Sequence, residues 1–241
     1  MTEEAPPQRQ VRAKQDDETL VVYQAYSPQI AAPAVAAGTF VAPFKRDRMT
    51  WIKPSFNWMM YRCGWATKPG QERVLAVTIT RAGFDWALEH ACLADFHPEL
   101  YGTYEAWQER KAASPVRVQW DPERSVALDR LDHRAIQVGL GGESVGRYVD
   151  EWITGIEDVT PLAQEIGALV AAGDREAARR RLPVETPLEL SSQAAPRCPN
   201  DSNADSTRAA GIPRSLLSCR TVARPKVTSV RYTKSASTGS P

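Results

Sequence analysis

The sequence predicts a single α+β domain with a mixed or antiparallel central sheet and flanking helices. Three observations favour this fold class. The 241 residues are 42% hydrophobic and 24% charged, which is ordinary for a globular protein. Short β-branched or aromatic runs alternate with amphipathic runs, so strands and helices intermingle along the chain. Their spacing is irregular and no βαβ rhythm persists, which argues against a doubly wound sheet.

The first predicted elements are a strand followed by a helix. Residues 19–26 are rich in β-branched and aromatic side chains, as strands are. Ser27-Pro28 then provides an N-cap and a proline in the first turn, which is a typical start for a helix. The alanine-rich run that follows continues to Ala37, and Gly38 is expected to end the helix.

Three further helices and one strand are predicted in the middle of the chain. Lys53-Pro54-Ser55 begins a short helix that runs to about Arg62 and is apolar on most sides, so it should be largely buried. Residues 73–79 form an apolar, β-branched run that predicts a buried strand. Thr80 then caps the next helix. Residues 104–113 predict another helix after it.

The last part of the domain is predicted to contain two strands and three helices. Residues 116–120 alternate between apolar and polar side chains, and residues 134–140 form a second strand that ends at two glycines. Residues 145–152 carry apolar side chains at helical spacing. Residues 160–170 and 174–181 complete the series as two capped helices.

A change of composition near residue 190 sets the expected end of the domain. Residues 191–241 are mostly Ser, Thr, Ala, Pro, Arg and Asn. Eight Lys/Arg against two acids give this tail a net charge of +6, so residues 1–190 carry −5 of the chain's +1. Its few apolar groups cannot offset roughly 1–2 kcal/mol of backbone entropy per ordered residue. We expect one domain over residues 11–190, with disorder in residues 1–10 and in the basic tail 191–241.

Hydropathy and residue spacing exclude several classes of protein. No apolar run approaches the length of a membrane-spanning helix, and the polar first 20 residues contain no secretory signal. Neither the histidines nor the cysteines have metal-ligand spacing, and no G-x-S-x-G run indicates a hydrolase. We therefore expect a cytoplasmic protein with no metal and no membrane partner. The four cysteines are scattered along the chain: Cys63, Cys92, Cys198 and Cys219.

The most unusual segment, residues 45–65, interleaves cationic side chains with tryptophans. Guanidinium groups bind phosphates in a bidentate manner, and indole faces stack on bases or nicotinamide rings. A nucleotide pocket needs both kinds of group. The alternative is that the tryptophans belong to the core and the cations to its solvated rim. Because aromatic residues also concentrate at interfaces, the tryptophans equally fit a homodimer surface.

A second polar run, Gln119-Trp120-Asp121-Pro122-Glu123-Arg124, follows a predicted strand. Its proline is expected to fix a turn there, which would place Asp121, Glu123 and Arg124 at a rim. Either acid is a candidate general base, or a partner for a ribose hydroxyl. The alternative is structural: a turn-capping aspartate and a Glu123–Arg124 ion pair.

These polar runs resemble the uncharacterised domain-of-unknown-function family 4291. The resemblance covers about residues 8–190, and Cys63 takes a place that is Ser in the family, which argues against a nucleophilic or metal role for this thiol. The matching runs are Val11-Arg12-Ala13, Val22-Tyr23-Gln24-Ala25-Tyr26, Arg48-Met49-Thr50-Trp51-Ile52-Lys53-Pro54-Ser55-Phe56, Trp58-Met59-Met60-Tyr61-Arg62, Gln119-Trp120-Asp121-Pro122-Glu123-Arg124 and Ile136-Gln137-Val138-Gly139-Leu140.

The resemblance brings no established activity, but it points to the polar runs as the site. The expected pocket has two catalytic candidates, Glu123 and Asp121. The expected ligand-binding residues are Arg12, Tyr23, Arg48, Trp51, Lys53, Arg62, Gln119 and Arg124.

The expected ligand is a nucleotide or another phosphate-bearing small molecule, and two functions follow from it. The order of elements is similar to that of ADP-ribosyltransferases, with Gln24 where those enzymes have Arg or His, which implies transfer chemistry on NAD. Arg48, Lys53 and Arg62 would then neutralise pyrophosphate, Trp51 or Tyr23 would stack on a ring, and Glu123 would be the acid–base group. The alternative is a non-catalytic nucleotide- or nucleic-acid-binding module. The net charge of −5 argues against broad, nonspecific nucleic-acid binding.

Overall fold

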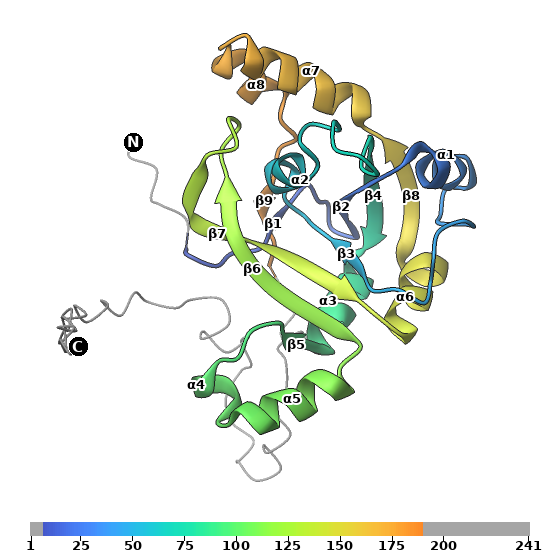
Figure 1. Cartoon of the computed structure of the whole chain (residues 1–241), viewed down its shortest axis with the longest axis vertical. Helices are drawn as coiled ribbons and strands as arrows, with labels where there is room; N and C mark the ends of the chain where they lie inside the picture. The colour runs from blue at the N-terminus through green and yellow to red at the C-terminus, as the bar shows by residue number, and fades with distance from the viewer. Residues whose placement is uncertain (1–6, 190–241) are drawn as a thin grey trace, which may run out of the picture.

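A computed structural model describes residues 7–189 and has the predicted α+β architecture, with mixed sheets and flanking helices (Figure 1). The expected disorder of residues 1–6 and 191–241 lies outside the described residues. Residues 7–10 differ from the expectation of a disordered start. Arg134 N donates to Gln8 O at 2.8 Å, and Arg9 forms a parallel bridge with Arg134, so this segment lies along a strand.

Two sheets carry the fold. The first has three antiparallel strands in the order β2-β4-β8. The second has four strands in the order β3-β7-β6-β5, antiparallel except for the parallel pair β5–β6. A short antiparallel pair, β1–β9, joins the start of the domain to its end. The strands are β1 Arg12–Ala13, β2 Thr19–Tyr26, β3 Thr50–Ile52, β4 Arg73–Thr80, β5 Ala91–Leu93, β6 Val116–Arg124, β7 Arg130–Leu140, β8 Ile153–Asp158 and β9 Thr186–Pro187.

Helices cover these sheets, with α7 and α8 at one end of the molecule and α4 and α5 at the other (Figure 1). Their predicted boundaries are confirmed where caps define them: Ser55 Oγ accepts from Trp58 N, and Gly38 and Gly64 end helices at φ 68° and 61°. The helices are α1 Pro28–Ala37, α2 Phe56–Cys63, α3 Arg81–Glu89, α4 Pro98–Tyr101, α5 Tyr104–Ala113, α6 Glu143–Arg147, the π-helix η1 Tyr148–Trp152, α7 Thr160–Ala171 and α8 Arg175–Arg181.

Helix α2 lies where the two sheets meet. Tyr23 N, in β2, donates to Lys53 O at 2.7 Å, and this bond ties the first sheet to the segment between β3 and α2. The buried residues Phe56, Met59 and Met60 place α2 in a core cluster with β2 and α7. A larger cluster lies between the sheets and contains Leu75, Val138 and their neighbours. The packing of α2 therefore determines where the polar residues at its two ends, such as Ser55 and Arg62, lie.

The prediction that Pro122 forms a turn is wrong. Strand β6 continues through Pro122 to Arg124, where the pairing with β7 shifts register. A proline lacks the N–H that a strand ladder needs, and a bulge is one of the few places in a sheet that tolerates this loss. The residues after Trp120 therefore lie on a strand, and they do not crowd one rim.

Substitution of Gly83 by alanine is expected to destabilise the domain by about 1–3 kcal/mol. Gly83 is buried in α3, and a Cβ there would lie 2.3 Å from Cγ of Trp152 in η1. Both elements would have to separate, because neither the indole nor the helix backbone can yield freely. Urea denaturation measures the loss.

Gly146→Ala is the matched control. Gly146 is also helical, in α6, but a Cβ there would meet nothing within 4 Å. Alanine is the better helix former, so this variant should gain up to about 1 kcal/mol. Equal losses in both variants would contradict the close packing of α3 on η1.

Candidate functional site

A cleft of about 670 Å3 opens beside β2, β3 and the start of α2. We call it the cationic cleft. It combines positively charged, aromatic and amide side chains. The residues that line it are Gln24, Ala25, Tyr26, Ile30, Pro43, Phe44, Lys45, Arg48, Met49, Thr50, Trp51, Lys53, Trp58, Met59, Arg62, Pro69, Gly70, Gln71 and Gln137.

The cleft is positively charged and holds no counter-charge of its own. Four cations line it, Lys45, Arg48, Lys53 and Arg62, and no aspartate or glutamate does. Within residues 7–189, none of these four forms an ion pair. A site built in this way attracts anions.

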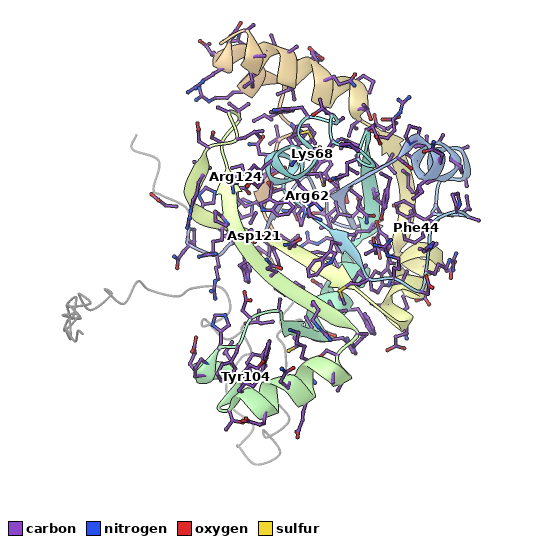
Figure 2. All side chains as sticks on the ribbon, in the orientation of Figure 1. Phe44, Arg62, Lys68, Tyr104, Asp121 and Arg124 are labelled. Carbon is purple, nitrogen blue, oxygen red and sulfur yellow. The ribbon has the colours of Figure 1, made fainter. Side chains whose placement is uncertain are left out.

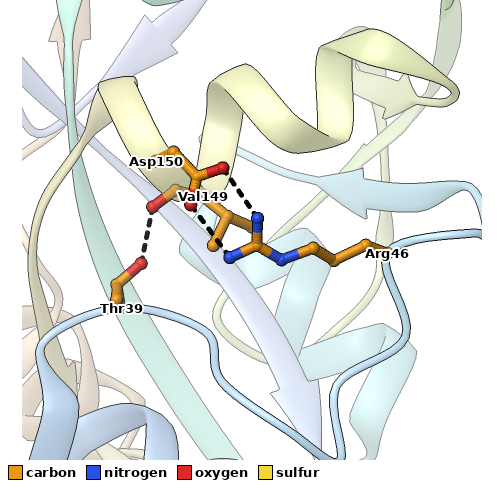
Figure 3. A network of polar contacts seen from close by, with 4 residues as sticks. All are labelled: Thr39, Arg46, Val149 and Asp150. Carbon is orange, nitrogen blue, oxygen red and sulfur yellow. Dashed lines mark hydrogen bonds and ion pairs between the residues drawn. The ribbon is translucent and has the colours of Figure 1, made fainter.

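Arg46, in the same loop as Arg48, has a different role. Its guanidinium binds the Asp150 carboxylate in a bidentate manner, at 2.7 and 2.9 Å (Figure 3). Nearby, Thr39 Oγ1 donates to Val149 O at 2.6 Å (Figure 3). These contacts fasten the loop between α1 and β3 to η1, so Arg46 positions the loop and leaves Arg48 available at the cleft.

Lys53 is the most enclosed cation of the cleft, with 6% of its surface exposed. Its Nζ donates to Trp51 O at 3.3 Å and lies 5.2 Å from the ring centroid of Trp58. Burial, together with the nearby charge of Arg62, lowers the pKa of Lys53 to about 7, and the charge of Asp121 opposes this fall. An amine with this pKa gains its proton readily when an anion arrives.

A buried hydrogen-bond network supports one wall of the cleft. Gln24 is 3% exposed, and its Oε1 accepts from Tyr148 Oη at 2.7 Å. Its Nε2 lies 2.7 Å from Thr50 Oγ1 and 2.9 Å from Tyr26 Oη. Burial raises the pKa of Tyr26 to about 12, so this phenol stays protonated. Gln24, Tyr26 and Thr50 therefore have fixed orientations along β2 and β3.

Neither candidate acid lines the cationic cleft. Asp121 lies behind Gln137, whose Nε2 donates to Asp121 Oδ2 at 2.6 Å, while Gln119 Nε2 donates to Oδ1 at 3.0 Å. Burial raises the pKa of Asp121, although these two hydrogen bonds and the charge of Lys53 oppose the rise. Asp121 is therefore the acid coupled to the cleft, through Gln137 and Lys53.

Glu123 lies in a separate hollow of about 250 Å3. Its Oε1 accepts from Ser55 Oγ at 2.8 Å and from Arg124 N at 2.7 Å. A second carboxyl shares this hollow, because Glu185 Oε1 accepts from Phe56 N at 2.7 Å. Burial, together with the charge of Glu123, raises the pKa of Glu185 to about 8. The lining residues of this second hollow are Arg12, Ser55, Phe56, Asn57, Glu123, Arg124, Leu131, His133, Leu182, Pro183 and Glu185.

The structure divides the expected pocket into several places. Arg48, Trp51, Lys53 and Arg62 meet in the cationic cleft, whereas Arg12, Glu123 and Arg124 meet in the second hollow. The expectation of one hollow for Arg48, Arg62 and Arg124 is therefore corrected. Figure 2 shows Arg62 and Lys68 at α2, and Asp121 and Arg124 along the neighbouring strand β6.

The two remaining predicted residues lie apart from both sites. Gln119 lines a third hollow, with Trp120 and Arg134. Tyr23 is 2% exposed and packs edge-on against Phe56, with 5.3 Å between the ring centroids. Tyr23 is therefore part of the hydrophobic core and lines neither site.

Gln24, Trp58 and Gln137 are among the cleft residues that are absent from the predicted site. For Gln24 and Gln137 the sequence does carry a signal, because each is an amide in an otherwise apolar strand. A polar side chain in such a strand needs partners, and these two obtain them at the edge of the cleft. The sequence therefore predicts that these two amides form hydrogen bonds, but it does not predict where in the fold their partners lie.

The described part of the chain contains neither a cluster of metal-ligating side chains nor a membrane-spanning helix. No group of three or more His, Cys, Asp or Glu side chains is arranged to hold a metal ion there. None of the helices between residues 7 and 189 is long and apolar enough to cross a bilayer. Cys63 and Cys92 are both buried and free, and burial raises the pKa of the Cys63 thiol.

Comparison with known proteins agrees with the resemblance seen in the sequence. The family model described as Domain of unknown function (DUF4291) matches residues 10–188, which include all the strands above and both polar runs. No curated protein matches the chain. Because the match covers far more than half of its length, the chain belongs to the DUF4291 family.

Proposed function

We propose that this domain binds a nucleotide in the cationic cleft. Arg48, Lys53 and Arg62 would hold its phosphates, and the indoles of Trp51 and Trp58 would offer surfaces to its ring. One observation carries the proposal: cations without carboxylate partners and two tryptophans line the same cleft. Nucleotide recognition requires both kinds of group, because one end of the ligand is anionic and the other is aromatic.

The charges that line the cationic cleft support an anionic ligand. Arg62 already disfavours the protonated form of Lys53, so these cations repel each other. A phosphate between them would remove this repulsion and would supply acceptor oxygens to Arg48 and Arg62, which no carboxylate engages. Hydrogen bonds between charged groups are worth about 1.5–3 kcal/mol each.

The size and remaining lining favour a nucleotide over inorganic phosphate. A cleft of about 670 Å3 falls in the range of about 300–1,000 Å3 that is usual for small-molecule sites. Phosphate alone would leave the apolar surfaces of Phe44, Met49 and Trp51 wet. The amides of Gln71 and Gln137 provide hydrogen-bonding groups of the kind that base edges need.

A second candidate function, transfer chemistry on NAD, is favoured by the coupling of Asp121 to the cleft. Asp121 interacts with Lys53 and is held by Gln137, so a carboxylate lies next to the proposed phosphate site. Under this hypothesis Asp121, rather than Glu123, is the acid–base group. Nicotinamide release from NAD tests it; if the protein binds NAD without any release, binding alone is the function.

Arg48→Ala is expected to weaken the binding of ATP and NAD by at least about tenfold, through loss of a charged hydrogen bond. Arg46→Ala is the matched control, since Arg46 lies two residues away but pairs with Asp150. Its affinity should stay within about twofold of wild type, because an exposed ion pair contributes only about 0–1 kcal/mol.

Titration calorimetry measures both affinities, and thermal shift gives an independent check. A ligand at 100 times its dissociation constant adds about 2.7 kcal/mol to the free energy of unfolding. The proposal fails if neither ATP nor NAD stabilises the wild-type protein. It also fails if Arg46→Ala and Arg48→Ala lose the same affinity.

A further inference from the structure

We propose that the nucleotide in the cationic cleft is the end of a single-stranded nucleic acid. The next phosphates of the strand would lie on a cationic path that leaves the cleft along α2. The path consists of Arg62, Lys68 and Arg124, arranged around the exposed ring of Tyr61. This inference rests on the function proposed above, and it specifies the substrate class of the same site.

The contacts between these side chains make the path continuous. Arg62 lines the cleft, and Lys68 Nζ donates to Arg62 O at 2.9 Å and to Tyr61 O at 3.3 Å. The same Nζ lies 5.9 Å from the centroid of the Tyr61 ring. The guanidinium carbon of Arg124 lies 3.5 Å from that centroid. Tyr61, 42% exposed, therefore holds two cations next to the mouth of the cleft.

None of these three cations forms an ion pair with a described residue. In the described part of the chain, no carboxylate oxygen lies within ion-pair distance of Arg62, Lys68 or Arg124. Arg124 Nε is buried without a hydrogen-bond partner, and Nη1 reaches only Leu128 O, at 3.4 Å. Cations that form no ion pair, two of them held over an aromatic ring, are suited to bind phosphates that come from outside.

The form of the site favours a strand end over a duplex. A base enters a cleft only when it is unpaired and unstacked, and a single strand meets this condition at a lower energetic cost than a duplex. Residues 1–190 carry −5, so most of their surface repels a long polyanion. A short path beside a single cleft therefore fits one terminal nucleotide and the few phosphates next to it.

The test compares ATP with 5′-phosphorylated hexanucleotides of RNA and of DNA, each single-stranded or annealed to its complement. The variant is the double substitution Lys68→Gln/Arg124→Gln. Its control is Lys111→Gln/Arg147→Gln, which also removes two cations placed over rings: Lys111 lies 4.3 Å from the Trp107 centroid, and Arg147 lies 4.7 Å from that of Trp86. Neither control residue lines the cleft.

The expected result is that wild type binds single-stranded hexanucleotide at least about tenfold more tightly than ATP. Each phosphate contact to a single strand adds about 0.7 to the slope of log affinity against log salt, so the double variant should lower that slope by about 1.4. Its affinity for ATP should stay within twofold of wild type, which also verifies its fold. The control pair should change neither affinity nor slope.

Each other outcome is decisive. Equal affinity for ATP and hexanucleotide, an unchanged slope in the double variant, or equal binding of the duplex overturns the inference and leaves a free-nucleotide site. If ATP and hexanucleotide both fail to bind, the proposed function itself fails. A preference for the RNA or the DNA strand supports the inference and identifies the strand, since only RNA offers a 2′-hydroxyl.

Discussion

Lys53→Met is expected to weaken nucleotide binding strongly and to make the domain more stable. Methionine has a similar length and fills the same enclosed position, but it brings no charge. Binding should weaken on the order of 100-fold, because the lost ammonium is the least hydrated cation of the cleft and its contact with phosphate is charge-assisted. Calorimetry with ATP measures this loss.

The gain in stability follows from the pKa of Lys53, which falls from 10.5 to about 7 on folding. Between these two values the unfolded chain binds more protons than the folded protein, so the contribution of Lys53 to stability rises with pH. Below pH 7 the full cost of a buried charge is present. Lys53→Met should therefore add about 2 kcal/mol to the free energy of unfolding at pH 6, and much less above pH 10.

Lys111→Met is the control for both effects. Lys111 also lies over an indole and donates to a backbone carbonyl, but it lies on α5, away from the cleft. Its stability should change by less than about 0.5 kcal/mol and its affinity for ATP not at all. A Lys53→Met protein that is less stable than wild type at pH 6 would show that the ammonium is a structural group, not a binding group.

The part of the site around Lys53 could be predicted from the sequence. Arg48, Trp51, Lys53 and Arg62 lie within 15 residues of each other, and one strand and one helix bring them together. A lysine in a short apolar segment is costly unless it has a function, so local composition was informative here. The cationic cleft is thus largely a local feature of the chain.

The second polar run misled because its partners come from distant segments. Glu123 binds Ser55, and the same hollow contains Arg12 and Glu185 from the two ends of the domain. Helix α2 separates the two sites: Ser55 lines the second hollow, and Trp58 and later residues line the cleft. Nothing in the local pattern around Glu123 indicates which side of α2 it faces.

The fold shows the same division between local and long-range information. Strands such as β2 and β4 were predicted because they are long, apolar and bounded by turns or caps. Strand β8, Ile153–Asp158, was missed, because Gly155 and two acids obscure its pattern and its pairing with β4 sets its structure. The two-residue strands β1 and β9 exist only because chain segments far apart in sequence pair with each other.

Glu185→Gln is expected to stabilise the domain by about 2 kcal/mol more at pH 9 than at pH 6. Burial raises the pKa of Glu185 from 4.5 in a free chain to about 8. Between these values the folded protein binds more protons than the unfolded chain, so the contribution of Glu185 to stability is lost as pH rises. Glutamine resembles the protonated carboxyl and still accepts from Phe56 N, so it removes this loss.

Denaturant unfolding at pH 6, 7.5 and 9 measures the difference between variant and wild type. Titration of Lys53 occurs in both proteins and cancels in this difference. Glu109→Gln, at an exposed position of α5, controls for the loss of one acid and should follow the wild-type curve at every pH. Stability curves of Glu185→Gln and wild type that stay parallel from pH 6 to 9 would show that Glu185 remains charged in the folded state.

Glu123→Gln then separates the two causes of the raised pKa. Burial is the larger cause and the charge of Glu123 the second, while Phe56 N and Arg12 oppose them. Removal of the Glu123 charge leaves burial in place, so the pKa of Glu185 should fall but stay above 4.5, and some loss of stability with rising pH should persist. In Glu123→Gln the fall in the free energy of unfolding that accompanies ionisation of Glu185 should therefore end at a lower pH than in wild type. An unchanged dependence of stability on pH would mean that the two carboxyls do not interact.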